Sequence, residues 1–382
     1  MREANGVDLA PLTTMRVGGP AARFMVAETP DEIVDVVREV DDADEPLLVL
    51  SGGSNMVIAD DGFPGTVLRI ANSGIDVESA DDCGGVHVRV AAGEEWDDFV
   101  ARCCAEGWSG VEALSGIPGL TGATPVQNVG AYGQEVAQTI ASVRTWDRQD
   151  QQVRTFANAD CEFAYRHSLF KGSSFRGGGR YVVLDVLFAL RPTELSQPVG
   201  YEALAKGLGV DLGARVPLGD AREAVLEQRR RRGMVLDADD HDTWSCGSFF
   251  TNPIISASAY DELSRVAAER LGTDAPAPPH WPTEESTPRS SPPLRSPDTS
   301  RGPRGTGVKT SAAWLIQHAG FDKGHGMPGP AALSTKHPLA ITNRGDAKAS
   351  DVADLAREVR DGVRDAFGVT LVNEPIFVGH EL

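Results

Sequence analysis

An arginine among apolar neighbours is the first candidate for chemistry. The segment CEFAYRHSLFK places Arg166 directly after Tyr165. A guanidinium in such surroundings is either a structural ion-pair partner or a clamp for a carboxylate. Its fork of N–H donors favours the clamp when the ligand is an anion. Both interpretations stay open at this point.

A serine and a glutamate are the next candidates. Ser248, in GSFFTNP, follows a glycine and lies beside aromatic residues, and an ordinary structural serine is the default interpretation. The GxSxG pattern is absent, and no histidine or lysine is placed by the sequence to activate the hydroxyl, so a proton donor is the better chemical role. Glu374 lies within a predicted final strand, where an acid is costly unless it is exposed, paired or used.

Two glycine-rich segments have the composition of ligand-binding loops. In SGGSN, from Ser51 to Asn55, the glycines allow successive backbone N–H groups to converge on one anion such as a diphosphate, although a plain hairpin turn fits equally well. The segment from Ser115 to Gly133 lets a flat ring approach the backbone, and Gln127 and Asn128 supply amides able to pair with ring carbonyls and nitrogens. Two such loops predict one extended cofactor.

Two other glycine motifs are rejected. The GHGMPG segment at 324–329 follows a predicted helix and contains a proline, unlike a dinucleotide fingerprint. The GTGVKT segment at 305–310 lacks the glycine that should precede the lysine of a phosphate loop. The five cysteines and eight histidines show neither CxxC nor HExxH spacing, so we predict no metal site and no disulfide framework.

Short helices and strands must position these groups. Helical spacing predicts helices over 30–40, 96–104, 222–232, 312–320 and 350–367, the last of them capped by Ser350. Strands are predicted at 47–50, 56–58, 67–70, 86–90, 181–190 and 369–379. Helices and short strands in this mixture indicate an α+β fold.

Composition limits the class of protein. The 382 residues are enough for two or three domains at about 150 residues each. The 55 acidic against 36 basic residues give a net charge of −19, which makes nucleic acid an unfavourable partner. No apolar run reaches membrane-spanning length, and the first residues do not have the pattern of a signal peptide, so we expect a cytoplasmic protein without a membrane partner.

Taken in order, these segments resemble the UDP-N-acetylenolpyruvoylglucosamine reductase family. The resemblance runs from TTMRVGGPA through SGGSN, SGIPGLTGATPVQNVGAYG, AYRHS, GSFFTNP and SAAWLIQHAGF to NEPIFVG, and it covers nearly the whole chain. It implies a vanillyl-alcohol-oxidase-type FAD-binding fold of two α+β subdomains, followed by an α+β substrate-binding domain. The implied cofactors are non-covalent FAD and NADPH as hydride donor, and the implied state is a monomer.

The resemblance also implies domain boundaries. The first FAD-binding subdomain would span residues 1–72, completed by the terminal strand at 369–382, and the second would span 73–235. The substrate-binding domain would span 236–368. Within it, a Pro/Ser-rich insert at about 274–307 has too few large apolar residues to offset its ordering entropy, so we expect it to be disordered.

Site residues carry over by position. The cofactor-binding residues would be Gly52, Gly53, Ser54, Asn55, Ser115, Gly116, Ile117, Pro118, Gly119, Gln127, Asn128, Gly130, Ala131 and Tyr132. The substrate-binding residues would be Tyr165, Tyr201, Arg229, Arg232 and Asn252. Tyr201 matches a mobile tyrosine loop of one subclass. Arg232 stands where a lysine is usual, and the arginine run from 229 to 232 leaves the register open.

The implied reaction is reduction of UDP-N-acetylglucosamine enolpyruvate to UDP-N-acetylmuramate in peptidoglycan synthesis. Arg166 would clamp the substrate carboxylate, and Glu374, protonated or sharing a proton, would hydrogen-bond the enolic oxygen. Ser248 would give the proton to C2. One alternative is an FAD-dependent oxidase of the same fold, which requires Cys104 or His167 near the flavin. Another is a catalytically silent binding protein, which needs no proton donor.

Overall fold

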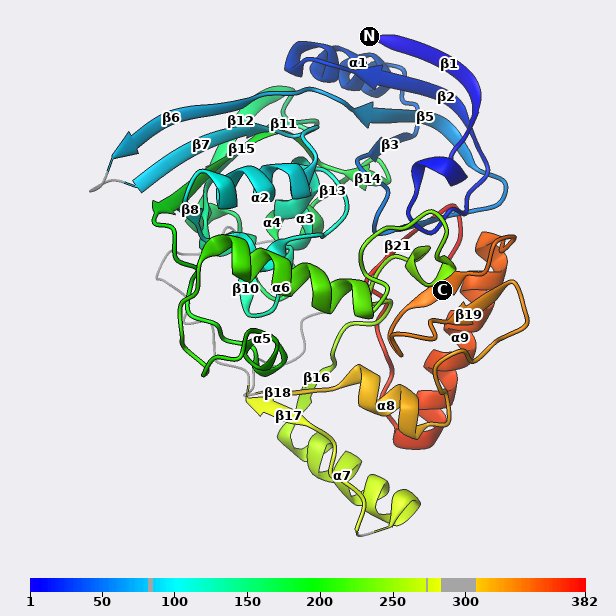
Figure 1. Cartoon of the computed structure of the whole chain (residues 1–382). Coiled ribbons are helices and arrows are strands. Elements are labelled where there is room, and N and C mark those ends of the chain that lie inside the picture. Colours follow the sequence, from blue (N-terminus) through cyan, green and yellow to red (C-terminus); the bar gives the residue numbers. More distant parts are fainter. Residues whose placement is uncertain (82–84, 273, 283–306) are drawn as a thin grey trace.

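A four-stranded sheet and one helix form the first part of the molecule. The computed structural model describes residues 1–81, 85–272, 274–282 and 307–382. The sheet order is β1 (Arg2–Asp8), β2 (Pro20–Ala27), β5 (Phe63–Ile70) and β3 (Leu47–Leu50), with β2, β5 and β3 parallel. Helix α1 (Pro30–Asp42) covers this sheet at the top of Figure 1. The Thr29 side chain accepts a hydrogen bond from Glu32 N at its start, and the predicted apolar side is buried.

A second sheet continues alongside the first. Its main strands, in order, are β12 (Gln152–Ala157), β11 (Ile140–Asp147), β15 (Tyr181–Pro192), β7 (Gly85–Ala91) and β6 (Ile75–Asp81), and β8 (Trp108–Ser109) pairs with β15. Helix α2 (Trp96–Ala105) packs Trp96 and Phe99 against Phe188 of β15. Asp185, in the middle of the buried β15, is paired with Arg89 and Arg144, which offsets the cost of burying its charge.

A buried ion pair joins these two parts. Arg148, just after β11, and Asp41, at the end of α1, have side chains that are 1% and 2% exposed. Arg148 Nη2 lies 2.6 Å from Asp41 Oδ1, and its Nη1 donates to the carbonyl of Gly179 at 2.9 Å. The guanidinium and the carboxylate therefore satisfy each other away from solvent.

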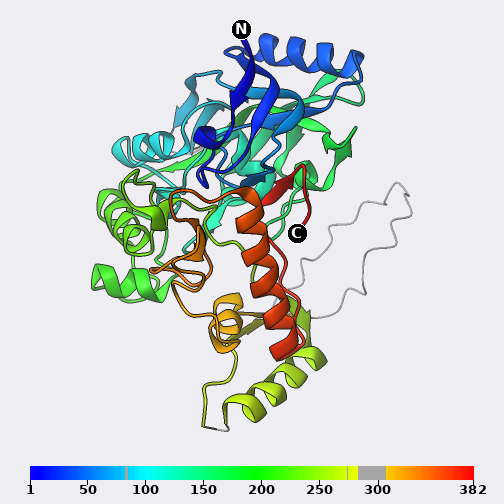
Figure 2. The same cartoon turned by 90° about the vertical axis from the view of Figure 1, so that its right-hand side faces the viewer.

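The third part lies below the other two. Helix α9 (Ala349–Phe367) runs along it, with α8 (Ala312–His318) beside α9 and α7 (Ala257–Leu271) at the far end (Figure 2). Strands β16 (Ile254–Ser256), β18 (Gly307–Thr310) and β17 (His280–Pro282) form one small sheet, and β19 (Ala331–Leu333) pairs with β20 (Ile341–Asn343). The predicted apolar stripe of α9 is buried, but its N-cap residue is Lys348, not Ser350.

Shorter elements complete the chain. Helix α6 (Leu218–Arg231) packs against α2, and α5 (Glu202–Leu208) packs against α6. Strands β4 (Met56–Ile58) and β21 (Ile376–Val378) pair in parallel. The remaining elements are α3 (Thr124–Gln127), α4 (Leu169–Gly172), β9 (Gly130–Ala131), β10 (Gln134–Glu135), β13 (Ser174–Phe175) and β14 (Gly178–Gly179).

Two sequence predictions differ from the structure. The final strand is three residues long, because only residues 376–378 pair with β4, whereas Asn373 forms an isolated bridge with Phe250. The expected disordered insert begins too early: the Tyr260 hydroxyl donates to the carbonyl of Pro278 at 2.6 Å, and β17 pairs with β18. The rest of that insert, 283–306, lies outside the described residues.

Candidate active site

One cavity of about 600 Å³ brings together residues from all three parts of the molecule. Most of the residues selected from the sequence line it. They are Ser54, Asn55, Ile117, Pro118, Gly119, Gln127, Gly130, Ala131, Tyr132, Tyr165, Arg166, Tyr201, Arg229, Arg232, Ser248, Asn252 and Glu374. Segments that are far apart in the sequence thus meet in one site.

Arg166 and Glu374 form an ion pair at one end of the cavity. Arg166 Nε lies 3.1 Å from Glu374 Oε1, and both side chains are about one-fifth exposed, at 22% and 17%. Arg166 Nη2 donates to the carbonyl of Gly130 at 2.9 Å. Arg166 Nε has no aligned hydrogen-bond acceptor, so a donor remains for an anion. The two interpretations of Arg166 are therefore compatible.

The backbone fixes Glu374 from two sides. Its N–H donates to the carbonyl of Phe249 at 2.8 Å, and its carbonyl accepts from Asn55 Nδ2 at 3.3 Å. Phe249 directly follows Ser248, and Asn55 ends the first glycine-rich segment. Glu374 is therefore held between the serine turn and the candidate diphosphate loop.

Ser248 lies on a turn that requires glycine at its start. Gly247 has a φ of +73°, a conformation that L side chains rarely adopt. The turn is tied down by its flanks, since the Thr14 hydroxyl donates to the carbonyl of Ser245 at 2.7 Å and Phe249 N donates to Leu339 O at 2.7 Å. Ser248 is half-buried and lines the cavity.

Two lysines that sequence reasoning missed add positive charge beside Arg166. Lys309 Nζ lies 3.6 Å from the centre of the Tyr165 ring, and burial together with Arg166 lowers the pKa of Lys309. Lys171 Nζ donates to Gln127 Oε1 at 2.7 Å, and burial lowers its pKa while Glu374 opposes the shift. Lys309 belongs to the segment rejected as a phosphate loop, and nothing in its local pattern indicates its position on β18.

The two glycine-rich segments touch each other. A Cβ on Gly52 would lie 2.5 Å from Gly119 Cα, so no side chain fits at that point. Gly53 has a φ of +59° and packs on the backbone of residues 12 and 13. Gly116 N donates to Asp97 Oδ1 at 2.6 Å, which ties the second segment to α2. The segments form one continuous wall.

Five predicted cofactor residues are not among the described residues that line the cavity: Gly52, Gly53, Ser115, Gly116 and Asn128. Asn128 is 1% exposed; its Nδ2 donates to Glu135 and to the carbonyl of Ala164, and its Oδ1 accepts from Ala137 N. The predicted pairing of Asn128 with a ring is therefore wrong, because its amide is used within the protein. Gln127 Nε2 is buried without a partner and lines the cavity.

The other end of the cavity carries Arg229, from the last turn of α6, and Arg232, which directly follows that helix. Arg222, Arg230 and Arg231 pair with acidic side chains. Among the described residues, Arg229 and Arg232 have no such partner, and both line the cavity. Positions 229 and 232 of the arginine run therefore face the cavity. Burial lowers the pKa of Arg229, whose Nη2 donates to the carbonyl of Met234 at 2.8 Å.

A histidine missed by the sequence analysis lies at the same end. His337 Nδ1 accepts a hydrogen bond from Leu339 N at 3.1 Å, so the proton of the neutral ring sits on Nε2. Burial, followed by Arg232, Lys323 and Arg229, lowers the pKa of His337 to about 4. The neutral His337 ring is therefore a hydrogen-bond donor placed near the cationic side chains of Arg229 and Arg232.

Asn252 has a structural contact as well as a cavity face. Its Oδ1 accepts from Ala312 N at 3.0 Å and joins the serine turn to the start of α8. Its Nδ2 has no protein partner among the described residues. The Asn252 side chain thus holds the start of α8 through its oxygen and leaves its Nδ2 donor available to a ligand in the cavity.

Comparison with known proteins matches both halves of this arrangement. Residues 239–378 match the family model of the UDP-N-acetylenolpyruvoylglucosamine reductase C-terminal domain, and residues 21–156 match that of an FAD binding domain. The UDP-N-acetylenolpyruvoylglucosamine reductase of Thermobifida fusca is 52% identical over 376 residues, covering 98% of each chain. That of Streptomyces avermitilis is 51% identical, covering 100% of this chain and 96% of its own.

This chain belongs to the UDP-N-acetylenolpyruvoylglucosamine reductase family. The crystal structure of the reductase from Thermus caldophilus, at 23% identity, has the same fold, with a TM-score of 0.60 over 99% of this chain and 98% of its own. The expected α+β flavoprotein fold is confirmed. Like its relatives, the chain is an FAD-containing oxidoreductase.

The residues present fit FAD. Ser51 Oγ, Thr121 Oγ1 and Gln127 Nε2 are buried polar atoms without a protein partner, and all three lie on the two touching glycine-rich segments. Of these residues only Gln127 lines the cavity, and because a buried donor without a partner is costly, a polar ligand at Gln127 Nε2 would relieve that cost. The glycine contact provides the close backbone approach that such a ligand needs.

The oxidase alternative finds less support. Neither Cys104 nor His167 is among the described residues that line the cavity. Burial raises the pKa of Cys104 to about 12, which disfavours the reactive thiolate. Of the residues described, no three His, Cys, Asp or Glu side chains gather as metal ligands, and no helix has the length and hydropathy of a membrane span.

Proposed function

We propose that this chain reduces UDP-N-acetylglucosamine enolpyruvate to UDP-N-acetylmuramate in peptidoglycan synthesis, with FAD as resident cofactor and NADPH as electron source. The observation that carries the proposal is the Arg166–Glu374 ion pair in the same cavity as Ser248. These three residues come from the second part, the chain terminus and the third part of the molecule. A binding protein has no need to bring a carboxylate and a hydroxyl to one anion clamp.

The touching glycine-rich segments would hold FAD. Ser54 and Asn55, supported by the backbone of Gly52 and Gly53, suit its diphosphate because converging N–H groups bind anions. The stretch from Ile117 to Gly119 and from Gln127 to Ala131 suits its ring system. When bound, FAD supplies two-electron chemistry, accepting a hydride from NADPH and delivering it to the substrate double bond.

The chain's own residues then manage charge and a proton. Arg166 binds the enolpyruvyl carboxylate with its guanidinium, and Glu374, which the ion pair holds beside it, hydrogen-bonds the enolic oxygen that develops when C3 is reduced. Lys309 and Lys171 strengthen the positive potential beside that carboxylate. Ser248 delivers its hydroxyl proton to C2, and the rigid turn after Gly247 keeps that hydroxyl in place.

Substrate recognition falls to the opposite end. Arg229 and Arg232 suit the UDP diphosphate, since arginine forks match phosphate oxygens. Tyr165 and Asn252 contribute a ring and an amide donor nearer the reacting group, and Tyr201 closes the wall. The partner is a small molecule; a monomeric state and a cytoplasmic location rest on the family resemblance and are checked by light scattering and cell fractionation.

An anaerobic two-step titration tests the proposal. The purified yellow protein is reduced with NADPH until its visible absorbance bleaches, and UDP-N-acetylglucosamine enolpyruvate is then added. Return of the flavin absorbance with formation of UDP-N-acetylmuramate supports both half-reactions. A protein that regains its colour only with oxygen is the oxidase instead, and a colourless protein that FAD cannot reconstitute removes the flavoenzyme assignment.

A further inference from the structure

Tyr132 occupies a backbone position that tyrosine disfavours. Strands β9 and β10 pair through Ala131 and Gln134, so Tyr132 and Gly133 form a two-residue turn between them. Both have positive φ values, +50° and +88°. Such turns favour Asn, Asp or Gly, whereas a bulky side chain in this region is strained. The strain points to a role for the ring itself.

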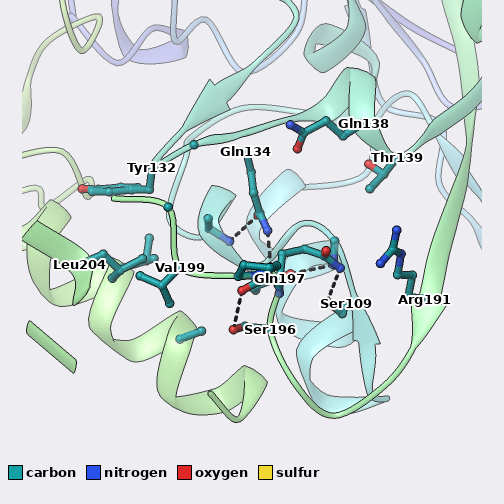
Figure 3. A pocket seen from close by; sticks show the side chains of 18 of the residues that line it. Ser109, Tyr132, Gln134, Gln138, Thr139, Arg191, Ser196, Gln197, Val199 and Leu204 are labelled. Carbon is teal, nitrogen blue, oxygen red and sulfur yellow. Dashed lines mark hydrogen bonds between the residues drawn. The ribbon is translucent and has the colours of Figure 1, made fainter. Parts of the chain in front are cut away.

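The Tyr132 ring contacts the segment that carries Tyr201. The two ring centres lie 5.4 Å apart at an interplanar angle of 88°, an edge-to-face arrangement. Tyr132 also packs against a small apolar cluster that includes Val199 and Leu204, residues on either side of Tyr201. Figure 3 shows Tyr132 beside both of these side chains.

A shared anchor fixes the two segments relative to each other. Glu112 is 2% exposed and accepts Gln134 Nε2 at 2.9 Å and Gln197 N at 2.5 Å. Gln134 follows the Tyr132 turn, and Gln197 begins the segment that leads to Tyr201. Glu112 therefore joins the two segments at Gln134 and Gln197, and the Tyr132 and Tyr201 rings form a second contact between them.

Tyr132 also separates the active-site cavity from a second one. The second cavity measures about 380 Å³ and lies between the 196–200 segment and Ser109, Thr139 and Arg191 (Figure 3). The two cavities share Tyr132, Gly133, Gln134 and Gln138. Without the Tyr132 ring, the Tyr201 segment would have free space on both sides.

We infer that Tyr132, at the proposed substrate-binding end of the cavity, is a positioning residue whose ring holds Tyr201 against that cavity. The inference rests on the proposed function. Burial raises the pKa of Tyr132. The next largest effects on this pKa come from Arg229 and Arg232, which lower it because they lie near the Tyr132 hydroxyl. Holding Tyr201 in place spares the substrate the cost of ordering that segment on binding.

The test compares three variants of the FAD-loaded full chain. Tyr132→Asn removes the ring with a residue that tolerates positive φ, Tyr132→Phe keeps the ring, and Leu212→Asn changes an exposed apolar side chain beyond α5 as a matched control. Tyr132→Asn should raise KM for UDP-N-acetylglucosamine enolpyruvate about fivefold to tenfold, the size that an aromatic pair supports, with little change in kcat. Tyr132→Phe should restore most of the affinity, and Leu212→Asn should match wild type.

A double-mutant cycle with Tyr201→Asn decides the mechanism. If the rings act together, the double variant should show no larger KM than either single variant. Additive effects, or an unchanged KM in Tyr132→Asn, would overturn the inference. Loss of FAD absorbance in Tyr132→Asn would make the residue a cofactor ligand instead. If wild type itself does not turn over this substrate, the proposed function fails rather than the role of Tyr132.

Discussion

The two ends of the cavity are built differently. At the Arg166 end, Glu374 and the Ser248 turn are fixed by hydrogen bonds with the Asn55 side chain and with the backbone carbonyls of Phe249 and Leu339. At the Arg229 end, two long cationic side chains have no carboxylate partner among the described residues, and Tyr201 is 40% exposed. Proton transfer depends on sub-ångström placement, whereas holding a diphosphate depends on charge. Substitutions at the Arg166 end should therefore change mainly kcat, whereas substitutions at the Arg229 end should change mainly KM.

Removing the serine hydroxyl should give the largest effect. Ser248→Ala deletes the hydroxyl that would give its proton to C2, so reoxidation of the reduced flavin by substrate should slow by about 10² to 10⁴-fold. Reduction by NADPH should stay near the wild-type rate, as followed by anaerobic stopped-flow absorbance. Normal turnover in this variant would remove Ser248 from the mechanism.

Glu374→Gln should act on the same step with a smaller effect. The amide keeps the size of the side chain but replaces the carboxyl group and loses the ion pair with Arg166, so reoxidation should slow about 10²-fold. The same stopped-flow traces give the rate. A rise in KM without a change in rate would place Glu374 with the binding end.

At the opposite end, Arg229→Gln and Arg232→Gln should each raise substrate KM roughly 10-fold, because a charged hydrogen bond to phosphate is lost. Added salt should weaken wild-type binding more than binding by these variants. Arg230→Gln is the control, since Arg230 pairs with Glu223 outside the cavity. Equal effects of all three substitutions would contradict the assigned register.

His337 should make stability pH-dependent. An unfolded imidazole titrates near 6.5 and His337 at about 4, so the unfolded chain takes up the proton first as pH falls. The contribution of the neutral ring is complete above pH 6.5 and declines down to about pH 4. Denaturant titrations should show that His337→Gln loses less stability than wild type over this window. Parallel curves would mean that His337 takes up its proton at the same pH in the folded and the unfolded chain, which contradicts the lowered pKa.

Shortening the Pro/Ser-rich insert should have the smallest effect of these changes. Deleting residues 286–301 should leave FAD content and turnover unchanged, because Pro282 of β17 and Val308 of β18 lie opposite each other in an antiparallel pair, so a shorter connection still spans them. Absorbance per protein and the standard assay check this. Loss of soluble folded protein would show that the insert has a structural role.

The sequence predicted those parts of the site that have local patterns. Glycine spacing indicated the two loops, and helical periodicity located α1 and α9. Lys309 and His337 were missed because each is a single residue brought in by tertiary packing. Asn128 was misjudged because glycine-rich composition indicates a loop but does not say which amide faces the ligand. The final strand was overextended because an apolar run does not show which residues find a pairing partner.

The buried Arg148–Asp41 pair has a consequence for how the protein comes apart. Losing either partner while the parts stay packed would leave the other charge unpaired in an apolar setting, which typically costs about 3 to 5 kcal/mol, so the pair ties the two sheets to each other. The two sheets should therefore melt in a single cooperative transition, and limited proteolysis should not release either as a stable fragment. An FAD held by the touching segments 51–55 and 115–133, one from each of these parts, would then be released only when both parts unfold together.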